Sequence, residues 1–99
     1  MNYRFTTAAA EEMVVAAEYY ESASAGLGAS FLDELEATVR RIQLNRETWR
    51  KISENHRKCR IRRFPFAIIY SLEEDDILIV AVMDLRRKPE HWKDRLRGD

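Results

Sequence analysis

Cysteine is nearly absent from this chain, which has only Cys59 among its 99 residues. A single cysteine excludes a disulfide within the chain and suits a protein that works in a reducing cytoplasm. Cys59 and the two histidines, His56 and His91, also lack any recognised zinc spacing. We therefore expect neither a metal nor another cofactor.

Long apolar runs are also missing. No run approaches the roughly 20 residues that a membrane-spanning helix needs, and residues 1–5 have no signal-peptide core. The composition, with 45% hydrophobic and 34% charged residues, is typical of a soluble globular protein. We expect one cytoplasmic domain over residues 1–99, with no membrane among its partners.

Neither sign of charge dominates, because 17 basic residues balance 17 acidic ones. The two signs are nevertheless segregated along the chain. Residues 40–63 carry ten bases against two acids, and residues 86–99 carry six bases against three acids. If the fold brings these two segments together, they form one basic binding surface; otherwise each block pairs with an acidic neighbour.

The first half of the chain predicts a strand and two helices. Residues 3–5 alternate between aromatic and basic side chains, as in a short strand. Thr6 or Thr7 then offers an N-cap for a helix that runs to residue 24 or 25. The apolar positions of this helix recur at helical spacing and are Ala10, Met13, Val14, Ala17 and Tyr20.

A short glycine link separates this helix from the next one. Residues 26–28 stop the first helix, since glycine accepts the left-handed geometry of a helix C-terminus. Ser30 then caps a second helix, and the short link predicts that the two helices pack antiparallel. The apolar stripe of the second helix is Phe31, Leu35, Val39 and Ile42.

The second half of the chain predicts three strands. Cys59 and Ile61 alternate with bases, which indicates a strand with one apolar face. A bulge or bend is expected at residues 63–65, where the alternation changes phase. The last strand is apolar throughout, as a central strand covered on both faces would be. The three strands are residues 58–62, 66–72 and 77–83, with a charged hairpin loop at residues 73–76.

Two further segments complete the chain. Residues 45–55 have weak periodicity and are expected to form a loop, anchored by Trp49 and Ile52. The chain leaves the sheet at residues 84–87, and Pro89 begins a short C-terminal helix that ends near residue 96. This order predicts an α+β fold in two layers, with the helical hairpin on one face of an antiparallel sheet.

Three short motifs occur in order along the chain. They are Gly-Leu-Gly-x-x-Phe-Leu at residues 26–32, Arg-Phe-Pro-Phe-Ala-Ile-Ile-Tyr at residues 63–70, and residues 81–92, which end in Arg-Arg-x-Pro-x-x-Trp. Together they resemble the RelE/ParE family of bacterial toxins, and the resemblance covers nearly the whole chain. It implies a two-layer RelE-like fold.

The resemblance also implies a function as the toxin of a type II toxin–antitoxin system, which inhibits growth and stabilises plasmids. A cognate antitoxin, whose C-terminal segment wraps the toxin, is then the expected partner in a hetero-oligomer. RelE-like members cut messenger RNA in the ribosome, whereas ParE-like members poison DNA gyrase. The long helical hairpin and the Arg-Arg-x-Pro-x-x-Trp ending are more similar to the ParE branch. DNA gyrase is the expected target, with ribosome-dependent RNA cleavage and an inactive antitoxin-binding relative as alternatives.

An RNA-cleaving site would need a base, an acid and cations that hold the phosphate. Glu54 and His56 are the candidate proton-transfer residues. Arg62 and Arg86 are the candidate cations, because a guanidinium binds phosphate through two parallel hydrogen bonds. RNA-cleaving members usually carry a Tyr or His near the C-terminus, where this chain has Trp92, and an indole cannot usefully exchange a proton. The sequence therefore favours a toxin that is not an enzyme.

A second set of residues is expected to bind the target or the antitoxin. Most of them also have a structural interpretation. Arg60 and Arg62 can be the solvated face of a strand, Arg86 can pair with Asp84, and Tyr70 can belong to the core. The candidate binding residues are Arg60, Arg62, Tyr70, Arg86, Arg87 and Trp92.

Overall fold

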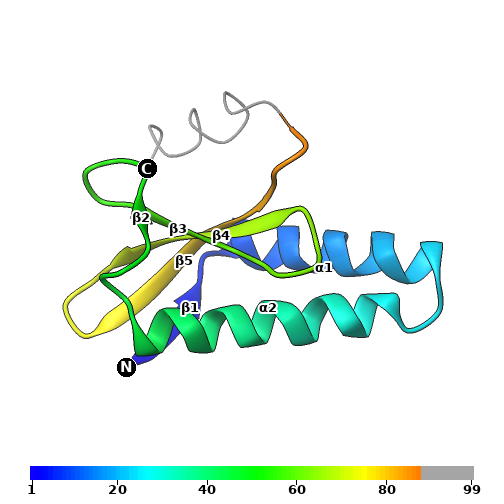
Figure 1. Cartoon of the computed structure of the whole chain (residues 1–99), viewed down its shortest axis with the longest axis horizontal. Helices are drawn as coiled ribbons and strands as arrows, with labels where there is room; N and C mark the ends of the chain where they lie inside the picture. Colours follow the sequence, from blue (N-terminus) through cyan, green and yellow to red (C-terminus); the bar gives the residue numbers. More distant parts are fainter. Residues whose placement is uncertain (88–99) are drawn as a thin grey trace.

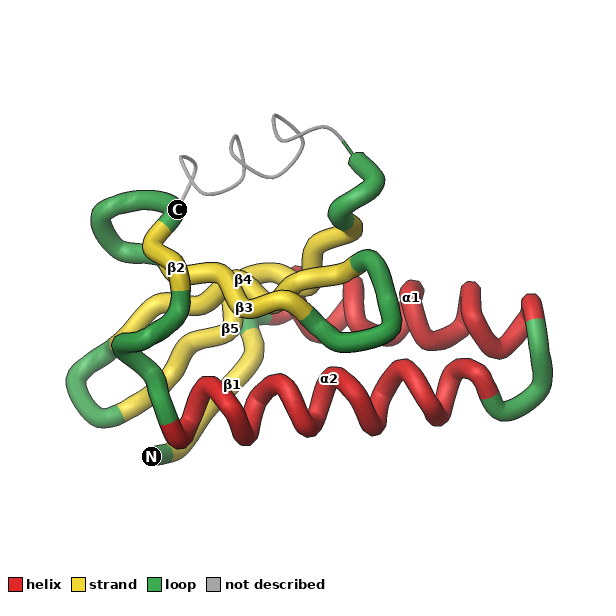
Figure 2. The backbone as a smooth tube through the Cα atoms, viewed as in Figure 1, coloured by secondary structure: helices red, strands yellow, loops and turns green. Residues whose placement is uncertain are grey.

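A computed structural model describes residues 1–87 of the chain. Two helices lie side by side on one face of a five-stranded sheet (Figures 1 and 2). The elements are β1 (Asn2–Phe5), α1 (Thr7–Ala23), α2 (Leu27–Leu44), β2 (Arg50–Lys51), β3 (Arg57–Arg60), β4 (Phe66–Leu72) and β5 (Asp76–Asp84). The predicted α+β fold in two layers is confirmed, whereas the predicted helix at residues 89–96 lies outside the described residues.

The sheet has the strand order β1-β5-β4-β3-β2. β3, β4 and β5 are antiparallel, as predicted, but β1 joins the far side of β5 in parallel, with Tyr3 opposite Ile77 and Phe5 opposite Ile79. The helical hairpin makes this arrangement possible because it carries the chain across the sheet between β1 and the later strands. β5 is therefore a central strand. The two-residue strand β2 lies inside the segment expected to be a loop, and its shortness explains why no alternation revealed it.

Residues 77–83 show no alternation because apolar clusters cover both faces of β5, as predicted, and β5 also contains a bulge. Ile69 pairs with Ala81 but Tyr70 pairs with Ile79, so Val80 is an extra residue in the ladder. The bulge reverses the face to which the later side chains point. Ile79 packs in the cluster beneath the helices, and after the bulge it is Ala81 that packs in the cluster on the other face.

The two helices begin differently. The Thr6 hydroxyl accepts a hydrogen bond from the Ala9 amide at 3.1 Å, as predicted for α1. α2 begins at Leu27 after Gly26, so the prediction that Ser30 caps this helix is wrong. The Ser30 hydroxyl instead donates to the Gly26 carbonyl oxygen at 3.3 Å.

The carboxylate of Glu21 explains the early start of α2. It accepts hydrogen bonds from the amides of Gly26 and Gly28, each at 3.0 Å, and so replaces a capping side chain from α2 itself. Gly26 has a φ of 87°, the left-handed conformation that the link predicts. At Gly28 a Cβ would lie 2.7 Å from the Ala17 carbonyl oxygen, so only glycine allows the helices to approach so closely.

The two helices differ in how they use their apolar residues. The predicted α2 stripe is confirmed, because all four of its members are buried beneath the sheet. In α1 the buried residues are Ala9, Ala16 and Tyr20, whereas Val14 is 49% exposed, so its place in the predicted stripe is wrong. Val15 and Tyr19 are also exposed, at 67% and 55%. α1 therefore presents a second apolar face that the core does not use.

The segment between α2 and β3 is anchored by side chains from the core. Trp49 and Ile52 pack against the two apolar clusters, as predicted. The Tyr70 hydroxyl donates to the Arg46 carbonyl oxygen at 2.7 Å, and Arg57 donates to the Trp49 carbonyl oxygen at 3.0 Å. Among the described residues, no helix combines the length and apolar character that crossing a membrane requires.

Candidate functional site

The fold brings parts of the two basic segments, residues 60–63 and 86–87, to the same end of the sheet. Phe66 pairs with Asp84, and the Leu85 amide donates to the Pro65 carbonyl oxygen at 2.8 Å. The bend between β3 and β4, residues 61–65, therefore lies beside the turn that follows β5, residues 85–87 (Figure 1). We call this end of the sheet, with Arg60, Arg62, Arg63, Arg86 and Arg87, the basic end.

Arg86 is held in place by three neighbours. Its guanidinium donates two hydrogen bonds of 2.9 Å to the Asp84 carboxylate, which confirms the predicted pairing. The central carbon of this guanidinium, Cζ, lies 5.8 Å from the ring centroid of Tyr19 and 5.9 Å from that of Phe66. Such stacking attracts a cation to an aromatic face. The hydrogen bonds lower the pKa of Asp84 and raise that of Arg86, so both groups are charged at neutral pH.

A groove runs along α1 beside the last residues of β5 and ends at Arg86. Its apolar lining includes Val15, Tyr19 and Val82, while Glu11 lies toward its other end. We call it the α1–β5 groove. It contains the exposed apolar face of α1, and exposed apolar surface rimmed by charge is typical of a protein-binding site.

The arginines of the β3–β4 bend are not equivalent. Arg63 has a φ of 72° and forms an ion pair with Glu34 at 3.5 Å, so it belongs to the structure of the bend. Arg60 and Arg62 are exposed and line a shallow surface at the bend. The Arg60 carbonyl oxygen accepts a hydrogen bond from Arg41 at 3.2 Å, but this bond leaves the Arg60 guanidinium exposed.

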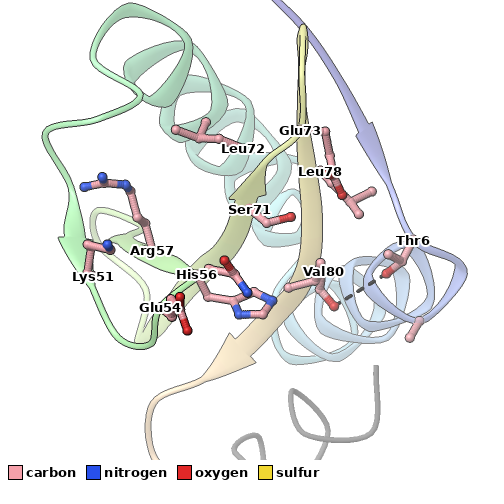
Figure 3. A pocket seen from close by; sticks show the side chains of 12 residues that line it. Thr6, Lys51, Glu54, His56, Arg57, Ser71, Leu72, Glu73, Leu78 and Val80 are labelled. Atoms are coloured by element: carbon pink, nitrogen blue, oxygen red, sulfur yellow. Dashed lines mark hydrogen bonds between the residues drawn. The ribbon is translucent and has the colours of Figure 1, made fainter.

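Glu54 and His56 line a second groove at the opposite end of the sheet (Figure 3). Its walls come from the β2–β3 connection and the start of α1, and its floor includes Leu78 at the start of β5. His56 Nδ1 lies 3.0 Å from the Ser53 hydroxyl. We call this end, with residues 52–56 and the β4–β5 loop at residues 73–75, the hairpin end.

The four candidate catalytic residues therefore do not share one site. Leu78 and Asp84 are six positions apart along β5, and a strand rises about 3.3 Å per residue, so the two ends lie roughly 20 Å apart. Glu54 and His56 are at the hairpin end, while Arg62 and Arg86 are at the basic end. Strands β3 and β5 run the length of the sheet between these two pairs of residues, so the structure does not bring the four candidates together.

The remaining candidate binding residues differ in exposure. Tyr70 is fully buried and burial raises the pKa of its phenol to about 12, so it supports the loop before β2 and is not part of an exposed surface. Arg87 is exposed and lines the α1–β5 groove. Trp92 lies outside the described residues. No group of three or more His, Cys, Asp or Glu residues in positions 1–87 is placed to hold a metal ion.

Sequence reasoning missed the α1 side of the site. Val15 and Tyr19 are apolar residues on the otherwise polar, exposed face of α1. They were the only sign in the sequence that this face could bind a partner. Their contact with the turn after β5 was not predictable, because it depends on the parallel pairing of β1 and on the bulge at Val80.

The chain is similar to a known protein family and to solved structures. A family model described as the ParE toxin of the type II toxin–antitoxin system parDE matches residues 3–89. The chain belongs to the ParE toxin family. Among solved structures it is similar to a chain from "Chromosomal ParDE TA system from P. aeruginosa", with a TM-score of 0.73 and 18% identity over 86% of this chain and 96% of that one. That likeness establishes the fold, and no curated protein matches the chain.

Proposed function

We propose that this ParE-family toxin acts in the bacterial cytoplasm by binding and inhibiting DNA gyrase, without chemistry of its own, and that a cognate antitoxin neutralises it. One observation carries the proposal. Glu54 and His56, the candidate proton-transfer pair, lie roughly 20 Å from the arginine cluster at the basic end, as the strand rise implies.

The separation matters because RNA cleavage needs its groups together. A base, an acid and the cations that stabilise the phosphate must all contact one phosphodiester within a few ångström. Binding makes no such demand. Exposed arginines at the basic end and an apolar groove beside them are sufficient to hold a protein partner.

The α1–β5 groove is the proposed site for the antitoxin. Val15 and Tyr19 expose large apolar surfaces that the core leaves uncovered. An antitoxin segment that covers them would gain apolar burial and would also lie against Arg86. Arg60 and Arg62, which lie beyond the groove, are left as the proposed contacts with gyrase.

A timed induction in a bacterial host tests this proposal. Thymidine and methionine incorporation are followed in the same culture after the toxin is expressed. If gyrase is the target, thymidine incorporation falls first, because replication depends directly on gyrase. An early fall in methionine incorporation would overturn the proposal and favour an attack on translation.

RNA cleavage remains the second candidate for one specific reason. Glu54 and His56 share their groove with Lys51 and Arg57, so a base, an acid and cations do occur together at the hairpin end (Figure 3). Arg57 is partly committed, since it donates to the carbonyl oxygens of Glu47 and Trp49 at 2.8 and 3.0 Å. If His56→Gln abolishes cleavage of translated messages, this candidate replaces the first.

A further inference from the structure

The basic end of the α1–β5 groove is closed by a carboxylate of the chain itself. Asp84 accepts two hydrogen bonds from the guanidinium of Arg86 and a third from its backbone amide, each at 2.9 Å. The Arg86 side chain is nevertheless 51% exposed. The arginine is thus already placed to bind a carboxylate, and it can be reached from the groove.

The surroundings of Arg86 suit a carboxylate from a protein better than a free ion. The guanidinium lies over the rings of Tyr19 and Phe66, and its Nε and one terminal nitrogen donate to Asp84, so a carboxylate that replaced Asp84 would meet the same pair of donors. Apolar side chains, Val15 and Val82 among them, continue the surface away from the arginine. A small anion would leave this apolar surface uncovered, whereas a peptide segment would bury it.

A buried hydroxyl near the pair also lacks a hydrogen-bond partner. Tyr20 Oη is the one buried side-chain oxygen or nitrogen in residues 1–87 without a partner. Arg86 and Asp84 are the charged groups that act on the pKa of this phenol, which burial raises. The Tyr20 ring packs on that of Phe66, at 6.0 Å between centroids, and Arg86 also lies over Phe66. The Asp84–Arg86 pair therefore lies within electrostatic range of this unpaired hydroxyl.

The charges at the two ends of the groove favour one orientation of a bound segment. Arg86 lies at one end and Glu11 is exposed toward the other. Between them lie apolar residues, Val15 and Tyr19 among them, and Glu12, whose carboxylate accepts a hydrogen bond from the Val82 amide at 3.0 Å. A complementary segment carries an acidic side chain at one end, apolar residues in the middle and a basic side chain at the other end.

We propose that Asp84 occupies, in the free toxin, the position of a carboxylate from the antitoxin, and that an Asp or Glu of an amphipathic antitoxin segment displaces it from Arg86. This inference rests on the proposed neutralisation by an antitoxin and names the chemistry of the segment. Because one ion pair replaces another, the exchange contributes selectivity. A segment without the acidic residue leaves the Asp84–Arg86 pair in place.

A peptide titration tests the exchange without the antitoxin itself. The probe is a blocked hexapeptide of lysine, alanine, leucine, alanine, leucine and glutamate, and its counterpart ends in glutamine. Binding is followed by NMR at the Nε–Hε signal of Arg86 in wild-type toxin and in Asp84→Asn. The Asn side chain keeps an oxygen that can accept the Arg86 amide, so the turn after β5 is retained.

The glutamate peptide is expected to shift the Arg86 signal and to bind Asp84→Asn about fivefold more tightly than wild type, since the internal competitor is gone. The glutamine peptide should bind both proteins equally. Asp76→Asn is the matched control. It removes the same charge from the opposite end of β5, where Asp76 pairs with Arg4 at 3.7 Å, and should leave both affinities unchanged.

Three results would overturn the inference. Weaker binding of the glutamate peptide to Asp84→Asn would mean that Asp84 positions Arg86 for its partner instead of masking it. Equal binding of the two peptides would mean that the groove does not distinguish the charged glutamate from the neutral glutamine. No shift of the Arg86 signal at millimolar glutamate peptide would mean that the groove does not bind such a segment.

Failure of this inference is separable from failure of the proposed function. The titration does not depend on toxicity, and the incorporation experiment does not depend on Asp84. An antitoxin that neutralises wild type and Asp84→Asn with equal affinity would refute the exchange alone.

Discussion

The two ends of the sheet carry similar kinds of side chain in different arrangements. At the hairpin end, Glu54 and His56 line a groove together with Arg57, whose guanidinium donates to two backbone carbonyl groups. At the basic end, Arg60 and Arg62 are exposed, and Arg86 is stacked against two aromatic rings. The difference indicates that arginine at the basic end serves recognition, while the arginine at the hairpin end holds a loop in place.

The largest expected effect is a difference in toxicity between variants of the basic end and variants of the hairpin end. Replacing both Arg60 and Arg62 with alanine is expected to reduce growth inhibition by at least about tenfold, because exposed arginines at a binding surface often dominate its affinity. The double variant Glu54→Gln with His56→Gln should remain as toxic as wild type. Toxicity is measured as the inducer concentration that halves the growth rate.

A charge-matched variant controls this comparison. Replacing Arg4 and Arg40 with alanine removes two arginines that are paired with Asp76 and Glu36, away from the basic end. If this variant loses toxicity to the same extent, total charge and not the basic end is responsible.

Antitoxin binding should depend on the exposed face of α1. Tyr19→Ala removes an aromatic ring from the α1–β5 groove and from Arg86, and should weaken binding of the neighbouring gene's antitoxin by about 2 kcal/mol, the scale of an interface hot spot. Because Tyr19 is 55% exposed, the stability of the free toxin should change little. Calorimetric titration measures the affinity.

Leu44→Ala provides the control for that experiment. Leu44 is 81% exposed at the end of α2 and is not among the residues that line the groove. Equal losses in the two variants would place the antitoxin elsewhere on the helical hairpin.

Two buried tyrosines offer a comparison within the core. Tyr70→Phe removes the hydrogen bond to the Arg46 carbonyl oxygen and should lower the free energy of unfolding by about 1 kcal/mol. Tyr20→Phe removes a buried hydroxyl that has no partner, so it should leave stability unchanged or raise it. Urea denaturation of both variants checks the difference, and an equal loss in Tyr20→Phe would show that its hydroxyl is satisfied in solution.

The smallest expected effect is the pH dependence of the Asp84–Arg86 pair. The hydrogen bonds from Arg86 hold the pKa of Asp84 below its ordinary value of 3.8. A carboxyl with a lowered pKa stabilises the fold above that ordinary value, and the stabilisation is lost as the pH falls through the lowered pKa. The stability difference between wild type and Asp84→Asn should be constant near neutral pH and shrink below about pH 4.

That difference will be modest, because Arg86 is half exposed and water screens the pair. Denaturant midpoints of the two proteins, measured across the acidic range, give the comparison. A difference that instead grows on acidification would contradict the assigned direction of the Asp84 pKa.

Much of the fold could be predicted from the sequence because its signals are local. The α2 stripe, the Thr6 cap and the strand at residues 66–72 depend on periodicity and on capping within a few residues. The start of α2 was missed because its cap comes from Glu21 in the preceding helix. The parallel pairing of β1 was missed because nothing local encodes it.

The site was harder to predict than the fold for the same reason. Arg60, Arg62 and Arg86 could be identified from charge and from the family motifs. Their meeting at one end, and the distance of Glu54 and His56 from them, follow from the register of β3, β4 and β5. The burial of Tyr70 could not be decided from the sequence, because an alternating strand does not reveal which of its faces is covered by helices.

The most direct test of the account is a supercoiling assay with purified DNA gyrase and three forms of the toxin. Wild type and the double variant Glu54→Gln with His56→Gln are predicted to inhibit gyrase equally, and the double variant Arg60→Ala with Arg62→Ala is predicted to lose inhibition. Gyrase that is unaffected by wild-type toxin, together with message cleavage that requires Glu54 or His56, would contradict the central claim.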